Sequence, residues 1–176
     1  MSLPNIITLV RILLVPVVVW AIASGRPQLA FWLFVAAGVS DALDGLIAKR
    51  FGMQTELGAY LDPLADKALL VSIYVALAAT AQVPSWVAIA VVTRDVLIVG
   101  AVLLSLVLAR PVAIAPLLVS KANTVAQICF AALVLGSAGF GIEAPELVEL
   151  GLVAVGLLTG VSAAAYLAEW TRHMAK

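Results

Sequence analysis

Four aspartates lie close together in a chain that is otherwise mostly apolar. They are Asp41, Asp44, Asp62 and Asp66. A lone carboxylate in hydrocarbon is costly or takes up a proton, so such groups pair, bind cations or line a wet cavity. On a helix the first two are spaced i, i+3 and the last two i, i+4, so each pair shares one face of its helix. Because the four offer only carboxylate oxygens, without His or Cys, they favour a hard divalent ion such as Mg²⁺ or Mn²⁺ over zinc or copper.

The residues between the two pairs are suited to binding phosphate. Lys49 and Arg50 supply positive charge, and Gly45 and Gly58 lack a side chain. Cations balance the charge of a phosphate group, and a missing side chain lets a ligand approach the backbone. The whole stretch therefore predicts a metal-assisted diphosphate site at a membrane surface.

The composition is typical of an integral membrane protein. Of the 176 residues, 64% are hydrophobic and 11% are charged, whereas a soluble domain carries about 45–50% apolar and about 25% charged residues. The formal net charge is zero, so no basic field indicates a nucleic-acid partner. A single cysteine, Cys129, excludes a disulfide or a cysteine metal site within the chain.

Six apolar segments approach the length of about 20 residues that a membrane-spanning helix needs. They cover residues 6–23, 31–50, 59–81, 85–109, 115–138 and 147–169, with turn-forming residues between them. Since these runs are solidly apolar and lack the two-residue period of barrel strands, they predict an all-α bundle of six transmembrane helices. Residues 2–10 alternatively form a short interfacial helix before the first span, because Pro4 suits a helix start. We expect a single membrane domain over residues 1–176.

Basic residues set the expected orientation in the membrane. With the N-terminus inside, the inner ends of the spans hold Lys49, Arg50, Lys67, Arg110, Lys121, Arg172 and Lys176. Since inner loops are enriched in Lys and Arg, we expect the aspartates at the cytoplasmic or matrix face of a bacterial or mitochondrial inner membrane. The run ending in Ala21-Ile-Ala23-Ser24 resembles a signal-peptidase site, but no Lys or Arg precedes it, and we expect the segment to be retained.

The spacing D-x₂-D-G-x₂-A-K-x₈-G-x₃-D-x₃-D, from Asp41 to Asp66, resembles the signature of the CDP-alcohol phosphotransferase family. The family motif has Arg where this chain has Lys49, which keeps the charge but loses the planar fork that grips phosphate with two bonds. The resemblance extends from Leu3 to about Ala132. It implies a six-span bundle, usually a homodimer, that moves a phosphatidyl or similar group from a CDP-linked donor to an alcohol and releases CMP.

The resemblance also implies roles for individual residues. All four aspartates would hold one or two Mg²⁺ or Mn²⁺ ions, and Asp66 would be the catalytic base that takes the proton of the acceptor hydroxyl. The positions that match the family's contacts with the CDP-lipid, here CDP-diacylglycerol, are Asn5, Thr8, Gly45, Ala48, Lys49, Thr55 and Gly58. Asn5 and Thr8 are alternatively caps of the first helix.

Two later stretches indicate an anionic acceptor. Arg94-Asp95 lies inside the fourth span, where an ion pair is costly unless a polar cavity receives it. The second stretch, Ser120 to Gln127, opens the fifth span. The residues expected to contact the acceptor are Arg94, Arg110, Lys121 and Asn123. A structural ion pair is the alternative for Arg94-Asp95, and an interfacial anchor is the alternative for Lys121.

These stretches most resemble the branch of the family formed by eukaryotic-type cardiolipin synthases. That branch joins phosphatidylglycerol to CDP-diacylglycerol, so the expected products are cardiolipin and CMP. The alternative is a phosphatidylglycerophosphate synthase with glycerol 3-phosphate as acceptor. Such enzymes typically have Arg-Glu and then a second arginine in the fourth span, whereas here Arg94-Asp95 is followed by Val-Leu-Ile-Val-Gly-Ala.

Two other classes of protein stay open at the level of sequence. One is a membrane carrier that uses intramembrane carboxylates, and the other is a non-catalytic lipid-binding scaffold. A proton path does not require glycines and basic residues at these spacings, which favours the enzyme. Release of CMP from CDP-diacylglycerol would distinguish an enzyme from both.

Overall fold

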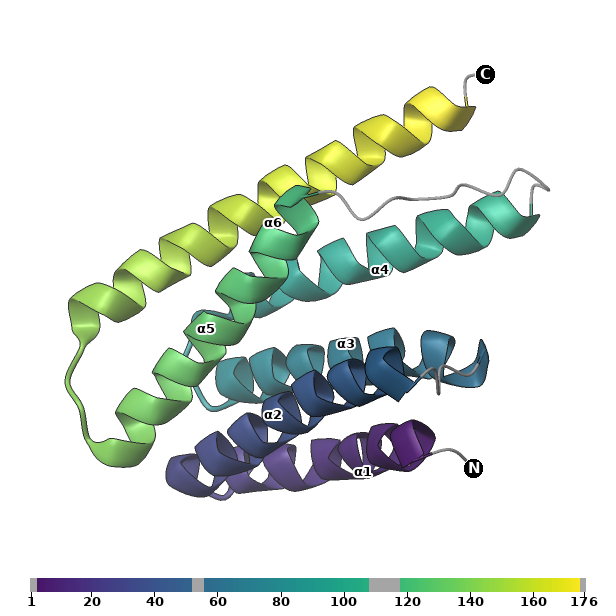
Figure 1. The fold of residues 1–176 in the computed structure, drawn as a ribbon. Helices are drawn as coiled ribbons and strands as arrows, with labels where there is room; N and C mark the ends of the chain where they lie inside the picture. The colour runs from purple at the N-terminus through teal and green to yellow at the C-terminus, as the bar shows by residue number, and fades with distance from the viewer. Residues whose placement is uncertain (1–2, 52–55, 108–117, 175–176) are drawn as a thin grey trace.

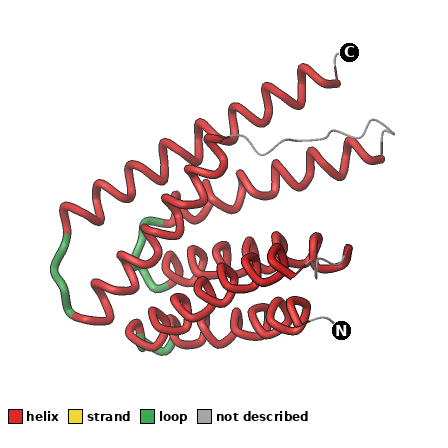
Figure 2. The backbone as a smooth tube through the Cα atoms, viewed as in Figure 1, coloured by secondary structure: helices red, strands yellow, loops and turns green. Residues whose placement is uncertain are grey.

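The computed structural model describes residues 3–51, 56–107 and 118–174, with side chains at 7–43, 64–101, 104–105 and 118–174. The described residues form six helices and no strand (Figure 2). In chain order they are α1 (Leu3–Ala23), α2 (Pro27–Phe51), α3 (Glu56–Ala79), α4 (Ser85–Val107), α5 (Leu118–Phe140) and α6 (Pro145–Met174). The expected all-α fold is confirmed over this part of the chain, and each helix begins and ends within a few residues of the predicted segment.

The first helix includes the residues for which a separate interfacial helix was the alternative. α1 is continuous over Leu3–Ala23, with Pro16 inside it, so a separate interfacial helix over residues 2–10 is wrong for the described residues. The reason is local. Pro4 lies in the first turn, where a missing N–H breaks no helical hydrogen bond, and no glycine interrupts the chain before Gly25.

Successive helices run antiparallel, so the bundle has two distinct ends (Figure 1). The connections α1–α2, α3–α4 and α5–α6 lie at one end, and both termini lie at the other. α1 packs against α2 and α3, α3 against α4, α4 and α5 against α6, and α2 against α5. The second half of α2 and the first half of α3, which carry the aspartates, therefore share the end of the bundle that holds the termini.

A close contact between α2 and α5 fixes the opposite end. A Cβ on Gly139 would lie 2.8 Å from the Cα of Gln28, so only glycine lets α5 pass this near the start of α2. Beside this contact the rings of Phe31 and Trp32 meet Phe140 edge to face, with centroids 5.3 Å and 6.1 Å away. The two helices are thus held together at one end, and the cavity described below lies further along between them.

Large apolar side chains are exposed on the outside of the bundle, while two arginines are buried inside it. Among the described residues, α5 and α6 are long and apolar enough to cross a membrane, and only 17% of the apolar window of α6 is buried. Leu118 and Leu150 are 83% and 66% exposed, whereas Arg11 and Arg94 are 2% and 3% exposed. Soluble proteins show the opposite distribution, since Arg is rarely buried in them. This pattern supports a membrane protein, and the count of six spans stays a prediction.

Candidate active site

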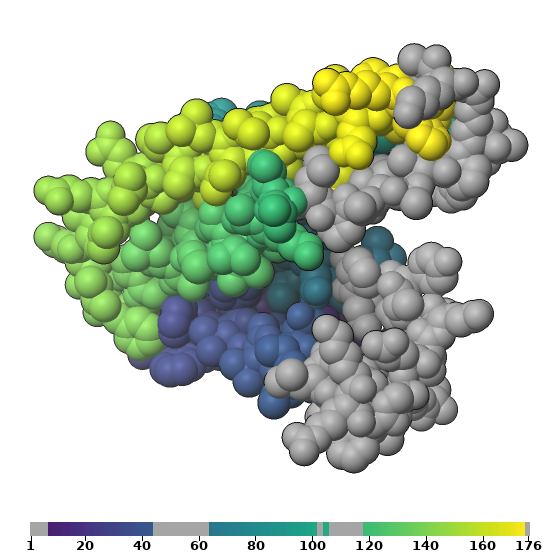
Figure 3. Space-filling model, turned by 45° about the horizontal axis from the view of Figure 1, so that its top comes forward, coloured from purple at the N-terminus to yellow at the C-terminus, as the bar shows by residue number. Residues whose placement is uncertain are grey.

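A cavity of about 440 Å³ lies among α1, α2, α3, α4 and α5. Most of its wall is apolar, and its charged lining residues are Arg11, Asp41, Asp66, Lys67, Arg94 and Asp95. Figure 3 shows the surface hollowed between α2 and α5, with α3 visible deeper inside. Three cations and three anions thus face one cavity in a protein whose other described surfaces are largely apolar. We refer to it as the central cavity.

Two of the four predicted metal ligands meet at this cavity. Asp41 comes from α2 and Asp66 from α3, and the Oδ1 atom of each lies 2.7 Å from Nη1 of Arg11 in α1. Since both oxygens contact the same nitrogen, the two carboxylates are immediate neighbours. Their side chains are 43% and 47% exposed. The structure therefore brings together one aspartate from each predicted pair, at the wall of the cavity.

The donor set fits a hard divalent cation. Neighbouring carboxylates supply the oxygen ligands that Mg²⁺ and Mn²⁺ prefer, without a nitrogen or sulfur ligand that would favour zinc. Within the side chains that the structure describes, no group of three or more His, Cys, Asp or Glu forms a metal cluster. Asp44 and Asp62, the other members of the predicted set, lie outside those side chains.

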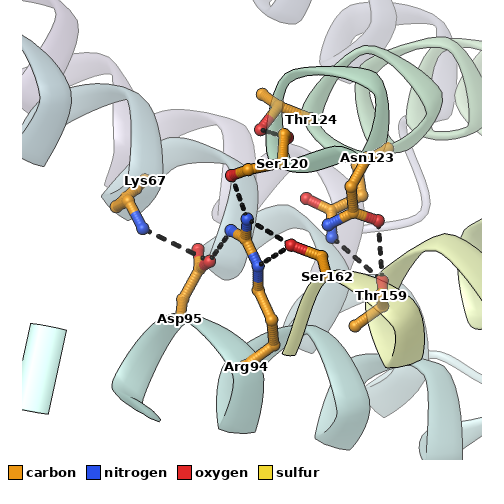
Figure 4. Close-up of polar contacts among 9 residues, drawn as sticks. Lys67, Arg94, Asp95, Ser120, Asn123, Thr124, Thr159 and Ser162 are labelled. Carbon is orange, nitrogen blue, oxygen red and sulfur yellow. Dashed lines mark hydrogen bonds and ion pairs between the residues drawn. The ribbon is translucent and has the colours of Figure 1, made fainter. Parts of the chain in front are cut away.

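Arg94 is held by three helices at once (Figure 4). Its Nη1 donates to Asp95 on its own helix, and its Nη2 donates to Ser120 of α5. Its Nε and Nη2 both donate to Ser162 Oγ of α6, at 3.2 Å and 2.9 Å. Every guanidinium nitrogen therefore has a protein partner. This arrangement fits the structural alternative for Arg94 better than a free anion-binding group, although the side chain borders the cavity.

Lys67 is the more accessible cation in the same network. Its Nζ lies 3.3 Å from Asp95 Oδ1, and its side chain is 35% exposed. The same Asp95 oxygen accepts from Arg94, so the carboxylate links a buried guanidinium to a partly exposed ammonium. Lys67 follows Asp66 directly in the chain and lines the central cavity. It is thus placed to meet an anionic ligand beside the aspartates.

Asn123 lies away from the cavity wall. It is fully buried, and its Oδ1 accepts a hydrogen bond of 3.0 Å from Thr159 of α6. Thr159 in turn accepts from Gln127 Nε2 at 3.3 Å, and the backbone oxygen of Gln127 accepts from Tyr74 at 3.0 Å. This ladder joins α3, α5 and α6, and Figure 4 shows its contact between Asn123 and Thr159. Asn123 thus holds helices together. Gln127, four residues later on the same helix, borders the cavity.

The other predicted contacts divide into two groups. Thr8 is buried in α1 and Lys121 is exposed on α5. The remaining predicted residues lie outside the side chains that the structure describes, and these are Asn5, Gly45, Ala48, Lys49, Thr55, Gly58 and Arg110. The predicted contacts of these residues with the CDP-lipid or the acceptor stay predictions.

A sequence model of the CDP-alcohol phosphatidyltransferase family matches residues 1–168. The chain belongs to this family. Members of the family are generally dependent on divalent metals, and the Asp41 and Asp66 carboxylates at the cavity have the chemistry that such ions prefer. The family assignment confirms the resemblance seen in the aspartate motif.

Relatives within the family carry two different names. "Probable cardiolipin synthase (CMP-forming)" of Drosophila melanogaster is 33% identical over 94% of this chain and 56% of its own length. The human "Cardiolipin synthase (CMP-forming)" is 37% identical over 57% of this chain and 34% of its own length. "Probable phosphatidylglycerophosphate synthase" of Mycobacterium tuberculosis is 38% identical over 53% of this chain and 48% of its own length. The chain thus spans about half the length of these relatives, or less.

Sequence reasoning missed two residues that the structure places at the site. Arg11 and Lys67 both contact carboxylates of the cavity, yet neither was among the expected site residues. A signal was present for Arg11, because a charged residue inside an apolar run needs a partner in the bundle. The signal for Lys67 was its position beside Asp66.

Proposed function

We propose that this chain is a membrane-embedded phosphatidyltransferase that moves a phosphatidyl group from CDP-diacylglycerol to the hydroxyl of phosphatidylglycerol. The products are cardiolipin and CMP. The observation that carries this proposal is the meeting of Asp41 and Asp66 at a cavity that also presents Lys67. Membership of the family supports the reaction class. The fly protein named "Probable cardiolipin synthase (CMP-forming)", which aligns with 94% of this chain, supports the acceptor.

The aspartates are proposed to serve both the metal and the acceptor. Asp41 and Asp66 would hold a divalent ion, together with Asp44 and Asp62 from the same two helices. Bound there, Mg²⁺ or Mn²⁺ supplies charge neutralisation for the diphosphate and for the departing CMP. Asp66 takes the proton of the attacking hydroxyl, a role that contributes roughly 10²–10⁴-fold when the base is within hydrogen-bond reach.

The bond changes are simple and need no covalent enzyme intermediate. The acceptor oxygen forms a new bond to the phosphorus that carries the diacylglycerol, and the bond from that phosphorus to the CMP oxygen breaks. Negative charge leaves with CMP, and the hydroxyl proton goes to Asp66. Lys67, whose ammonium Asp95 holds at 3.3 Å, is placed to orient an anionic acceptor by charge.

We also propose how the chain is placed in the membrane and in which oligomer it works. The six helices cross the membrane, with the termini and the aspartates at the cytoplasmic or matrix face of a bacterial or mitochondrial inner membrane. The exposed apolar surface of α6 and the burial of charged residues support this placement. The working unit is a single membrane domain over residues 1–176 that pairs as a homodimer.

A second candidate is a phosphatidylglycerophosphate synthase with glycerol 3-phosphate as acceptor. The relative from Mycobacterium tuberculosis, which is 38% identical over half of this chain, favours it. The sequence after Arg94-Asp95 favours cardiolipin synthesis, because it lacks the second arginine expected of the alternative.

An acceptor assay separates the two candidates. Purified protein in detergent is given Mn²⁺ and CDP-diacylglycerol, with phosphatidylglycerol or glycerol 3-phosphate in separate reactions. The lipid products are identified by mass spectrometry. We expect cardiolipin from the first and no lipid product from the second. Phosphatidylglycerophosphate from the second reaction, with no cardiolipin from the first, would reverse the choice of acceptor. If neither reaction releases CMP, the proposed function is wrong.

A further inference from the structure

Arg11 is a buried charge that needs a functional or structural reason. It lies on α1 inside an apolar run, and only 2% of it is exposed. Burying a charged group without a partner is strongly unfavourable. Here its Nη1 contacts two carboxylates, each at 2.7 Å, which come from α2 and α3. Arg11 thus joins three helices at the point where the predicted metal ligands meet.

Both carboxylates are accessible from the cavity. Arg11 Nη1 reaches the Oδ1 atom of Asp41 and the Oδ1 atom of Asp66, and a carboxylate oxygen can accept from more than one partner. Both aspartate side chains remain nearly half exposed and line the central cavity. The guanidinium is almost fully buried, whereas accessible carboxylate surface remains at the cavity.

The charges also favour a cation on the cavity side. Two neighbouring carboxylates repel each other, and a cation that contacts both offsets the repulsion. Arg11 brings one positive charge to the two negative charges of Asp41 and Asp66, so the formal charges of these three side chains leave a surplus of one negative charge. A site of this kind keeps the two aspartates adjacent and still attracts a divalent ion.

We propose that Arg11 is a positioning residue that orients Asp41 and Asp66 as ligands for a divalent cation. It acts through the two carboxylates and does not touch substrate. Groups that hydrogen-bond to metal ligands fix the orientation of those ligands, and removing such a group typically weakens metal affinity by about 10–100-fold. The inference rests on the proposed function, because it assumes that these aspartates bind metal.

The test measures Mn²⁺ affinity directly, by calorimetry or by the EPR signal of free Mn²⁺, on detergent-purified protein. Arg11→Gln removes the charge, and Arg11→Lys keeps the charge but changes its reach. Arg94→Gln is the matched control, because Arg94 is equally buried and has no described contact with Asp41 or Asp66. Thermal unfolding in chelator, recorded for each variant, shows that the protein is folded.

We expect Arg11→Gln to weaken Mn²⁺ binding by about 10–100-fold, Arg11→Lys to weaken it less, and Arg94→Gln to leave it unchanged. A folded Arg11→Gln or Arg11→Lys protein with wild-type or tighter affinity would overturn the inference. Tighter binding would mean that Arg11 competes with the ion for the oxygens. Failure of the wild-type protein itself to bind Mn²⁺ would instead overturn the proposed metal site, and the role of Arg11 with it.

Discussion

Replacing Asp95 by asparagine tests whether the network around Arg94 is a buried ion pair. Asp95→Asn keeps the shape of the side chain and removes only its charge. Arg94, whose side chain is 4% exposed, would then keep the hydroxyls of Ser120 and Ser162 as partners. Asp95 is the anion that contacts Arg94 in the described part of the chain, so the substitution leaves a buried guanidinium without charge compensation.

The expected loss of stability follows from the burial of the pair. Removing one partner of a buried ion pair costs about 3–5 kcal/mol, because the remaining charge stays away from water. For a chain of this size 1 kcal/mol corresponds to a shift in Tm of about 2–4 °C. Asp95→Asn is therefore expected to lower Tm by roughly 10 °C.

Lys67→Gln is the matched control for this experiment. It removes the other cation that contacts Asp95, but Lys67 is 35% exposed, and pairs near the surface contribute about 0–1 kcal/mol. Thermal unfolding of both variants in the same detergent is the assay. If Asp95→Asn lowers Tm no more than Lys67→Gln does, Arg94 is compensated in another way and our reasoning about the network fails.

Three further predictions concern the metal, the acceptor and the packing. Chelation with EDTA should abolish CMP release, and added Mn²⁺ should restore it; activity that persists in chelator would exclude the metal. Lys67→Gln should raise KM for phosphatidylglycerol roughly tenfold with little change in kcat, because one hydrogen bond to a charged group is lost; an unchanged KM would remove Lys67 from the acceptor site. Gly139→Ala, whose new methyl would lie 2.8 Å from Gln28 Cα, should cost about 1–3 kcal/mol of stability. Gly160→Ala, with nothing within 4 Å, should be neutral or slightly stabilising, and equal Tm values for the two variants would contradict the packing of α2 on α5.

The helices could be predicted from sequence because their causes are local. Long apolar runs separated by turn residues such as Ser24-Gly25 and Gln82-Val83-Pro84 fix where each helix begins and ends. The meeting of Asp41 and Asp66 was also predictable in outline, since a carboxylate pair on each of two helices needs a common partner inside the bundle.

The partners of the buried polar groups could not be predicted in the same way. Arg94 and Asn123 were expected to face an acceptor, but they contact Ser162 and Thr159, which are 68 and 36 residues away in sequence. Such contacts depend on how α6 packs against α4 and α5, and local sequence does not determine that packing. Arg11 presented the same problem, because Asp41 and Asp66, which it contacts, lie on other helices.

The most direct test of the account is CMP release by three proteins under one set of conditions. Wild type, Asp66→Asn and Glu143→Gln are each given CDP-diacylglycerol, phosphatidylglycerol and Mn²⁺; Glu143 is an exposed acid of the α5–α6 connection and controls for the loss of a charge. We expect Glu143→Gln to match the wild type and Asp66→Asn to be slower by roughly 10²–10⁴-fold. A folded Asp66→Asn protein that releases CMP at the wild-type rate would contradict the claim that this carboxylate carries the chemistry.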